Sequence, residues 1–343
     1  MNTPKTADEL RAKFLDFFES KNHLVHPSSS LIPSGDPTLL LTNSGMAQFK
    51  SYFSGEKKPP NFRMATSQKC FRTTDIEEVG DDTHLTLFEM LGNFSFGDYF
   101  KEEACKWALE FMTDILNFDK KSLFFTIYKD DDETEKIWEK LGIPKKYIYK
   151  FGDEDNWWGP AGDEGPCGPC SELHYYTGDL NKMRFTDSKW GPNIHEDFVE
   201  LYNLVFTQFY RDIDGKDTNL PFNNIDTGMG LERTVSVLNN VKSSYDTDIF
   251  RDHLTYLDTL VKGNKKDFDK YKRIIAEHGR SASFLIGDGV LPENTGRGYV
   301  LRRLIRRAMI TAKKLDLDFP ILLSLIHISE PTRPLYISYA VFC

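Results

Sequence analysis

Residues 62–100 read FRMATSQKCFRTTDIEEVGDDTHLTLFEMLGNFSFGDYF, and they carry the most informative pattern in the chain. Its segments 68–73 and 84–90 mix polar and apolar positions at short spacing, which is typical of half-buried strands. The acidic segment between them, residues 75–82, is too charged to be buried. The pattern therefore predicts a hairpin whose two arms enter the protein and whose loop stays in water.

Cationic side chains lie on both arms of this hairpin: Arg63, Lys69 and Arg72 on the first and His84 at the start of the second. A ligand held by such a hairpin would be an anion. Arg binds phosphate through two parallel hydrogen bonds and can also stack its planar guanidinium on a purine ring. A nucleotide is therefore the first hypothesis for the ligand.

Phe71-Arg72 followed by His84-Leu-Thr-Leu-Phe88 resembles motif 2 of class II aminoacyl-tRNA synthetases, and the run from Phe88 to Phe100 closely resembles its form in alanyl-tRNA synthetases. The generic class pattern places Glu two positions after the Arg, where this chain has Thr74. Three other stretches agree with the resemblance. They are residues 27–50 (PSSSLIPSGDPTLLLTNSGMAQFK, similar to motif 1 and its surroundings), 165–172 (GPCGPCSE) and 228–233 (GMGLER, the form of motif 3).

Composition describes an ordinary globular chain. Its 343 residues can hold two or three domains, with 40% apolar and 28% charged residues. The hydrophilic N-terminus and the lack of a long apolar run predict neither a secretion signal nor a membrane span, so the cytoplasm is expected. The net charge of −9 argues against a surface that is basic throughout, although a local basic patch on an acidic body remains compatible with RNA.

Hydrophobic spacing predicts the other elements. Helices are expected from a capping box at residue 6 to about residue 22, over 102–117, over 130–141, and from residue 271 onwards. Strands are expected at 123–128 and 200–209, and the latter would present Glu200 and Asn203 on one face. The run 39–41 is interpreted as part of a loop that feeds a core strand. The segment 156–174, rich in Gly and Pro, is expected to be a long stiff loop.

Cys167 and Cys170 invite a zinc interpretation, with His174 and His195 as the remaining ligands. No second CxxC pair follows, and the spacing matches no common zinc finger, so the two thiols are interpreted as small buried apolar groups. Five cysteines spread through a chain of this length do not indicate a disulfide framework. No zinc site is expected.

The resemblance implies an α+β fold, with a class II synthetase-like, mostly antiparallel sheet flanked by helices and followed by a partial helical domain. It places the catalytic domain at 1–240 and the start of a helical tRNA-recognition domain at 241–323. Residues 324–343 are expected to be an unrelated tail. The implied activity is that of an alanine–tRNA ligase, which activates L-alanine with ATP and Mg²⁺ and transfers it to the 3′ end of tRNA(Ala).

The resemblance also implies the roles of individual residues. Arg72 and Arg233 are the catalytic candidates, because they would neutralise phosphate charge. ATP would contact Arg63, Arg72, His84, Phe88, Met90, Gly230 and Arg233, with Phe88 as the shelf under adenine. Glu200 is a candidate Mg²⁺ contact. The alanine pocket would be formed by Met46, Trp158 (or Trp157), Asn203, Val205, Asp226 and Gly228, with Asp226 binding the ammonium group.

The predicted C-terminal helix carries its apolar residues on one face and four arginines on the other: Arg302, Arg303, Arg306 and Arg307. Such a stripe suits RNA phosphates, although a solvated helix face is an equally good interpretation of any single Arg. A shortened chain without the family's editing domain is expected to activate alanine but not to clear serine errors, since an apolar pocket rejects an added hydroxyl poorly. We expect a monomer.

Two alternatives remain open. The chain could be a different class II synthetase, which amino-acid preference in an activation assay would reveal. It could also be a non-catalytic RNA-binding or regulatory fragment, although such a module would not need the set Arg72, Asp226 and Arg233. A P-loop or dinucleotide-binding enzyme is disfavoured, because the chain contains neither GxxxxGK[ST] nor a GxGxxG at residues 92–97.

Overall fold

The computed structural model describes residues 3–34, 38–261, 267–317, 321–322 and 324–325. The chain divides into two compact units, each assembled from several segments. Unit 1 comprises 1–28, 44–68 and 90–234, and unit 2 comprises 29–43, 69–89 and 235–343. The expected boundaries at 240 and 323 remain a prediction, and most of the expected tail lies outside the described residues.

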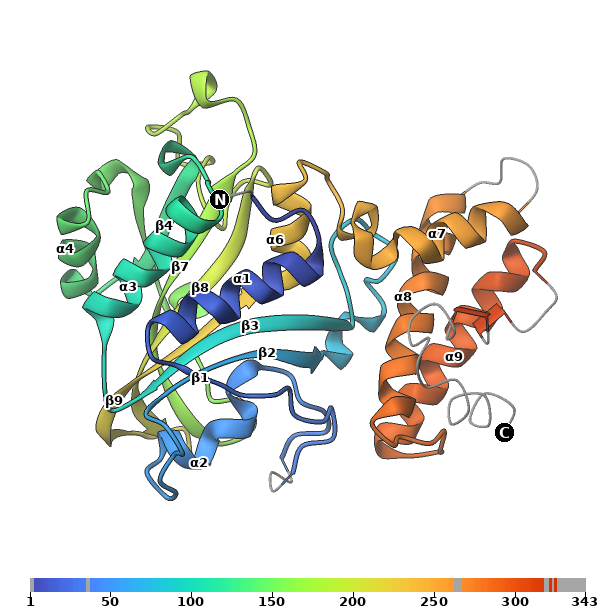
Figure 1. Cartoon of the computed structure of the whole chain (residues 1–343), viewed down its shortest axis with the longest axis horizontal. Helices are drawn as coiled ribbons and strands as arrows, with labels where there is room; N and C mark the ends of the chain where they lie inside the picture. Colours follow the sequence, from blue (N-terminus) through green and yellow to red (C-terminus); the bar gives the residue numbers. More distant parts are fainter. Residues whose placement is uncertain (1–2, 35–37, 262–266, 318–320, 323, 326–343) are drawn as a thin grey trace. The chain divides into compact units, whose positions relative to one another are not determined.

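A mixed, mostly antiparallel sheet forms the body of unit 1 (Figure 1). Its path through the described residues is β1-β2-β3-β9-β8-β7-β4-β5, with β6 paired to β7. Only the terminal pairs β1–β2 and β4–β5 are parallel among the registers described. The strands are β1 (Leu24–Val25), β2 (Arg63–Phe71), β3 (Leu87–Phe96), β4 (Leu123–Tyr128), β5 (Ile148–Phe151), β6 (Trp157–Trp158), β7 (Gly165–Tyr176), β8 (Phe198–Arg211) and β9 (Asp217–Gly230). The expected α+β fold class is confirmed.

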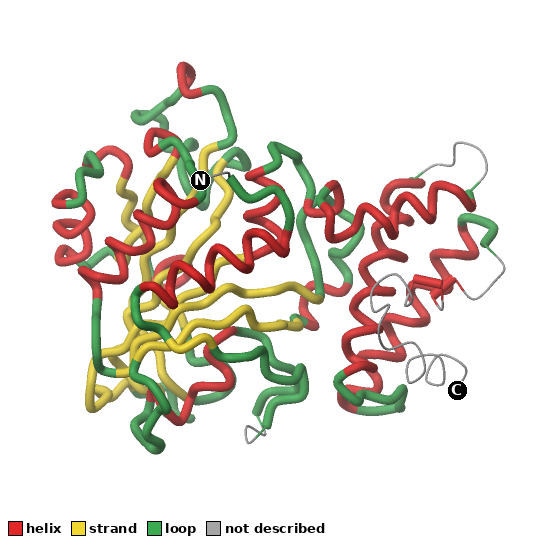
Figure 2. Tube along the Cα trace, viewed as in Figure 1, coloured by secondary structure: helices red, strands yellow, loops and turns green. Residues whose placement is uncertain are grey.

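Helices flank the sheet in unit 1 and dominate unit 2 (Figure 2). The α-helices of the described residues are α1 (Ala7–Ser20), α2 (Lys50–Phe53), α3 (Lys101–Glu110), α4 (Asp132–Lys140), α5 (Asp153–Asn156), α6 (Leu231–Leu238), α7 (Asp248–Leu260), α8 (Phe268–Gly287) and α9 (Gly296–Lys314). The predicted cap at Thr6 is present, because its side chain accepts a hydrogen bond from the Glu9 amide.

Helix α1 covers one face of the sheet. Its Phe14 ring packs edge-on against Tyr202 of β8, with 6.3 Å between ring centroids, and against Phe111 at 5.3 Å. Side chains alternate between the two faces of a strand, so Asn203 points to the opposite face from Tyr202. We call the face of β8 that carries Asn203, and that α1 does not cover, the open face of the sheet.

The segment expected to be a loop at 156–174 is largely a strand, and that prediction was wrong. β7 spans Gly165–Tyr176, and its backbone pairs with both β8 and β4. Glycine is required here for packing and not for flexibility, because a Cβ on Gly168 would collide with the Phe206 carbonyl oxygen. The glycines and prolines that allow this close approach between paired strands have the same composition as a loop. The sequence alone therefore did not distinguish the two.

The expected strand at 200–209 is confirmed within β8, and its irregularity explains how two side chains share a face. Glu200 and Asn203 are three positions apart, which would place them on opposite faces of a regular strand. The pairing with β7 shifts, so that Asn203 lies opposite Glu172 while Glu200 lies opposite His174. This β-bulge inserts one residue and returns Glu200 and Asn203 to the same face.

The run 39–41 leads into a different structure from the strand we expected. Leu39 and Leu41 are buried and Leu40 is exposed, all in irregular backbone. A 3₁₀ helix, η1 (Gly45–Phe49), and the short helix α2 follow, and the next strand begins only at residue 63. The apolar run is therefore explained by burial of the Leu39 and Leu41 side chains, and residues 39–41 form no strand.

Unit 2 is built on α7, α8 and α9 together with the loop between β2 and β3. One apolar cluster joins Phe71, Ile76 and Leu87 to residues of α8 and α9. A second joins Leu85 and Phe88 to α7, α8 and α9. The hairpin loop predicted at 75–82 keeps its acidic side chains outward, but Ile76 and Val79 anchor it to the core.

Candidate active site

Four residues predicted for the alanine pocket lie together on the open face of the sheet. In the pairing of β8 with β9, Asn203 lies opposite Gly228 and Val205 lies opposite Asp226. Directly opposed residues on antiparallel strands project to the same side, with Cβ atoms about 5 Å apart. The sheet register therefore brings this quartet into one patch.

Asp226 is the unusual member of this patch. Its side chain is buried, with 5% of the residue exposed, and its carboxylate forms no hydrogen bond or ion pair with another described residue. Burial raises the pKa of Asp226 to about 8. A buried carboxylate without a partner is costly, and a cationic ligand would relieve that cost.

Apolar side chains border the same face. Met46 is buried in a cluster with Phe94 and Ala161, and Trp158 packs against that cluster. The Met90 side chain lies directly over Gly228, and a Cβ atom on Gly228 would be 2.8 Å from the Met90 sulfur. A glycine at 228 therefore leaves room for the methionine, and a larger residue would displace it.

The structure separates the two adjacent tryptophans. Trp158 joins the cluster that contains Met46. Trp157 stacks on Phe209 with ring centroids 5.6 Å apart, and the Arg211 guanidinium lies 5.7 Å from its ring. Successive strand residues point to opposite faces. The arrangement supports Trp158 as the pocket wall and gives Trp157 a packing role.

Arg233 and Glu200 hold each other at the edge of this face. Arg233, in the first turn of α6 just after Gly230, donates from Nη1 to the Glu200 carbonyl at 2.9 Å and contacts the Glu200 carboxylate at 3.2 Å. Both side chains are about half exposed, so an incoming phosphate can reach Arg233. Among the described residues no group of three His, Cys, Asp or Glu side chains is placed to hold a metal ion.

A Mg²⁺ ion that arrives with a nucleotide needs only one or two protein carboxylates, since it retains waters and phosphate oxygens. Glu200, at 38% exposure of its side chain, fits that requirement and is the residue that would hold the ion. The ion would supply charge neutralisation at the phosphates. The two cysteines of the rejected zinc interpretation are buried thiols, and burial raises the pKa of both.

Arg63 lies elsewhere. Its Nε donates to Asp98 at 2.6 Å, its Nη1 donates to the Lys21 carbonyl at 3.1 Å, and its guanidinium packs over Tyr99 and Trp107. Its hydrogen bond with Asp98 raises the pKa of Arg63. These partners belong to the side of unit 1 that carries α1 and α3, so the geometry gives no support to Arg63 as a phosphate contact.

The nucleotide candidates of unit 2 are close neighbours. Arg72 is exposed, its backbone amide donates to the Thr86 carbonyl at 2.9 Å, and its guanidinium lies 5.0 Å from the Phe88 ring. An Arg over an aromatic face forms a cation–π contact, and a purine could stack on the same ring. His84 instead pairs with Asp81 at 2.6 Å, a contact that shapes the loop.

A buried network ties this loop to α8 and α9. Glu277 accepts hydrogen bonds from the Thr86 amide and hydroxyl, both at 2.6 Å, and contacts His278 at 2.5 Å. Burial opposes ionisation of Glu277, but the hydrogen bonds from His278 and Thr86 outweigh it and lower its pKa to about 2. Arg307 extends the network by contacting His278 at 2.7 Å and donating to the carbonyls of Glu77 and Val79 at 3.1 and 3.0 Å.

The predicted arginine stripe thus divides into two kinds of residue. Arg307 is half-buried and holds the loop, and burial lowers its pKa. Arg303 forms an ion pair with Glu77, whereas Arg306 is exposed. A cleft of about 790 Å³ follows this surface of unit 2. Its lining includes Arg302, Arg303, Arg306, Lys270 and Lys314 together with Tyr271 and Tyr299.

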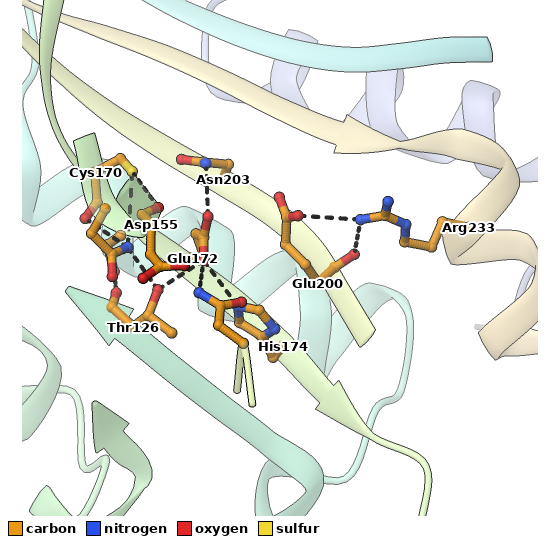
Figure 3. A network of polar contacts seen from close by, with 11 residues as sticks. Thr126, Asp155, Cys170, Glu172, His174, Glu200, Asn203 and Arg233 are labelled. Carbon is orange, nitrogen blue, oxygen red and sulfur yellow. Dashed lines mark hydrogen bonds and ion pairs between the residues drawn. The ribbon is translucent and has the colours of Figure 1, made fainter. Parts of the chain in front are cut away.

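Sequence reasoning missed one residue at the centre of the open face. Glu172 of β7 accepts hydrogen bonds from Thr126, His174 and Asn203 (Figure 3). The signal was present in Ser171-Glu172-Leu173-His174, where two polar residues alternate as on one face of a strand. The loop interpretation of this segment concealed it.

Comparison with known proteins agrees with this geometry. A sequence model of the family "tRNA synthetases class II (A)" matches residues 9–332. Alanine–tRNA ligases of Dehalococcoides mccartyi and Natranaerobius thermophilus are 51% and 52% identical over 324 and 314 residues, which cover 93% and 90% of this chain. The chain spans 37% and 35% of the lengths of these two curated relatives.

A solved structure of S. aureus histidyl-tRNA synthetase aligns over 72% of this chain and 73% of its own, with a TM-score of 0.41 and 14% identity. A TM-score this low carries no argument about the fold, so the fold class is assigned from the order and pairing of the strands. Over the described residues, no helix is both long enough and apolar enough to cross a membrane. The chain therefore belongs to the class II (A) tRNA synthetases, and it corresponds in sequence to the class II catalytic portion of alanyl-tRNA synthetases.

Proposed function

We propose that this chain activates L-alanine with ATP to form alanyl-adenylate and then transfers the alanyl group to the 3′ end of tRNA(Ala). The observation that carries the proposal is Asp226, a buried carboxylate that no described residue pairs, on a face that it shares with Asn203, Val205 and Gly228. An amino acid offers the ammonium group that this carboxylate lacks. The likeness to alanine–tRNA ligases supports alanine as that amino acid.

In the first step, an oxygen of the alanine carboxylate forms a bond to the α-phosphorus of ATP, and the bond from that phosphorus to pyrophosphate breaks. The attacking carboxylate is already ionised near pH 7, so no general base is required. Catalysis then comes from positioning and from charge neutralisation at the phosphates. We assign Arg72 to the α-phosphate and Arg233 to the γ-phosphate.

Substrate selection follows from the surroundings of this chemistry. Phe88 would support adenine, because its ring face already accepts the Arg72 guanidinium. Met46, Met90 and Trp158 would limit the volume beside the alanine methyl group. An apolar wall separates neighbouring side chains only modestly, since one methylene changes binding by about 1–3 kcal/mol.

In the second step, a hydroxyl of the terminal ribose of the tRNA attacks the carbonyl carbon of the adenylate, and AMP leaves. The hydroxyl proton passes to a phosphate oxygen of the adenylate. We propose that Arg302, Arg303 and Arg306 bind the RNA backbone along the cleft of unit 2. Release of counterions from RNA would make this binding salt-dependent.

The test is ATP–pyrophosphate exchange with alanine, glycine, serine and proline, comparing the wild type with Arg72→Ala. We expect exchange to be fastest with alanine and to fall by at least about 100-fold in the variant, which loses a charge-assisted contact to the transition state. Lys189→Ala, which changes an exposed residue of unit 1, is the matched control. Absence of exchange with every amino acid would favour the alternative of a non-catalytic RNA-binding fragment.

A further inference from the structure

A row of directly opposed residues crosses the open face of the sheet. Thr126 of β4 lies opposite Glu172 of β7, Glu172 lies opposite Asn203 of β8, and Asn203 lies opposite Gly228 of β9. The three polar side chains are linked by hydrogen bonds (Figure 3). The row therefore connects the scaffold of unit 1 to the predicted alanine patch.

Glu172 is the centre of this row and is fully engaged. Its Oε2 accepts from the Thr126 hydroxyl and from His174 Nε2, both at 3.0 Å, and from Asn193 Nδ2 at 3.3 Å. Its Oε1 accepts from Asn203 Nδ2 at 3.2 Å. The residue is 7% exposed. Four donors around one buried carboxylate fix its position and leave it little freedom to rotate.

This contact decides which way the Asn203 amide points. An ionised carboxylate can only accept hydrogen bonds, so the amide must turn its NH₂ group toward Glu172. The Asn203 oxygen then points away, and it is buried without a hydrogen-bond partner among the described residues. A buried oxygen in that state can accept a hydrogen bond from a ligand.

Asp226 lies diagonally across the strand pair from Asn203, on the same face. Diagonal neighbours on antiparallel strands are about 7–8 Å apart at their Cα atoms, which is close enough for one small group to contact both side chains. An ammonium group has three donors and could use Asp226 and the Asn203 oxygen together.

We propose that Glu172 is a positioning residue of the alanine site: by holding the Asn203 NH₂ group, it presents the Asn203 oxygen to the substrate ammonium. The inference rests on the proposed function and extends it to a residue that does not touch the substrate. Without the Glu172 carboxylate, the Asn203 amide can rotate and present its NH₂ group, which repels a cation. The cost then falls on alanine binding and not on ATP binding.

The test is Glu172→Gln, which keeps the shape of the side chain and removes its charge. In pyrophosphate exchange we expect the KM for alanine to rise about 10- to 100-fold, the effect of losing one hydrogen bond to a charged group. The KM for ATP should stay within about twofold, because Glu172 affects only the alanine-binding face. Glu196→Gln changes an exposed carboxylate of the same unit and serves as the control.

A second variant separates orientation from structural support. In the double variant Glu172→Gln with Asn203→Asp, the carboxylate at position 203 accepts from the amide NH₂ group introduced at position 172 and still offers an oxygen to the ammonium group in either orientation. We therefore expect the double variant to recover most of the affinity for alanine. Asn203→Asp alone should not match it, because that change places two carboxylates side by side.

Equal rises in KM for alanine and ATP in Glu172→Gln, or no recovery in the double variant, would overturn the inference in favour of a purely structural role. Calorimetric titration of alanine into each variant adds a readout that does not depend on catalysis. Alanine binding that follows the predicted order without any exchange would retain the positioning role and refute the ligase activity. Absence of both binding and exchange in the wild type would overturn the two proposals together.

Discussion

At the scale of single residues, we expect Asp226 to make the proposed alanine activation depend on pH. Its pKa of about 8 in the free protein means that most molecules carry a protonated, neutral carboxyl at pH 6 to 7. An ammonium ligand binds the ionised form. Below pH 8 the ionised fraction rises about tenfold per pH unit, so the apparent affinity for alanine should rise with pH and level off above 8.

The measurement is kcat/KM for alanine in pyrophosphate exchange between pH 6 and 8.5, with the KM for ATP determined at each pH. Asp226→Asn should abolish alanine-dependent exchange, because an amide cannot replace the charge. A flat alanine profile in the wild type would mean that Asp226 is already ionised in the free protein and that the buried carboxyl has another partner in solution.

Motifs named candidate residues for this site, and their roles stay predictions; the residues that support them were not named. Asn203, Val205, Asp226 and Gly228 were named from sequence, and the register of β8 with β9 places all four on one face. Glu172 was missed because the loop interpretation of residues 156–174 concealed its place on a strand. Its importance comes from four donors on four different segments, and no local pattern records such a convergence.

At the scale of elements, α9 carries two kinds of arginine: one is engaged with the loop and one is exposed on the cleft. Arg307 supplies three contacts that hold the loop after Arg72: two to backbone carbonyls and one to His278. Arg306, one position earlier, is exposed on the cleft. The adjacent arginines therefore form a matched pair for testing the proposed RNA binding, because one contacts the loop and the other is exposed.

We expect Arg307→Ala to lower the free energy of unfolding of unit 2 by about 1–3 kcal/mol, because it leaves carbonyl acceptors of the loop without donors. Arg306→Ala should change stability by less than about 0.5 kcal/mol, weaken tRNA binding, and reduce the slope of log affinity against log salt by about one. Urea unfolding and filter binding at several salt concentrations check both. Unaltered tRNA binding in Arg306→Ala would exclude this cleft as the RNA site.

The strands show where sequence patterns succeed and fail at this scale. β4 was predicted at its observed bounds because its short run rich in β-branched and aromatic residues, LFFTIY, has one simple interpretation. β7 was missed because Gly and Pro usually interrupt strands, whereas here Gly168 permits a close approach to β8. The difference depends on the partner strand, because the residue that Gly168 approaches, Phe206, lies more than thirty positions later in the sequence.

At the scale of the whole molecule, the division into two units was not apparent from the sequence. Unit 2 takes residues 29–43 and 69–89 from within the region expected to be one catalytic domain. These segments bury Leu31, Ile76 and Leu87 against α8 and α9. Apolar periodicity shows that a residue is buried but does not show which core receives it.

The two units should respond differently to acid. Each contains a buried histidine, His23 in unit 1 and His253 in unit 2, and burial lowers the pKa of both from 6.5 to about 4. The unfolded chain binds protons at these sites from pH 6.5 downwards while the folded units do not. Stability is therefore lost as pH falls, by about 2–3 kcal/mol per histidine at pH 4.

In unit 1, Asp226 has the opposite effect of pH on stability. Its folded pKa of about 8 lies above the ordinary value of 3.8, so between these values the folded state binds more protons and gains stability as pH falls. The contributions of His23 and Asp226 thus largely cancel in unit 1. In unit 2, Glu277 does not offset the stability that His253 loses on acidification. Its pKa is lowered to about 2, so the folded state does not gain stability from Glu277 as pH falls.

We therefore expect unit 2 to unfold more readily than unit 1 when pH falls from 7 to 4.5. All five tryptophans, at positions 107, 138, 157, 158 and 190, belong to unit 1, so tryptophan fluorescence reports on that unit. Circular dichroism at 222 nm weights the helices of unit 2. The melting temperature from dichroism should fall further than that from fluorescence, and His253→Gln should narrow the gap. Asp226→Asn should make the fluorescence transition acid-sensitive as well, because His23 then acts unopposed.

Coincident transitions that shift together in every variant would show that the units unfold as one and that neither histidine controls its own unit.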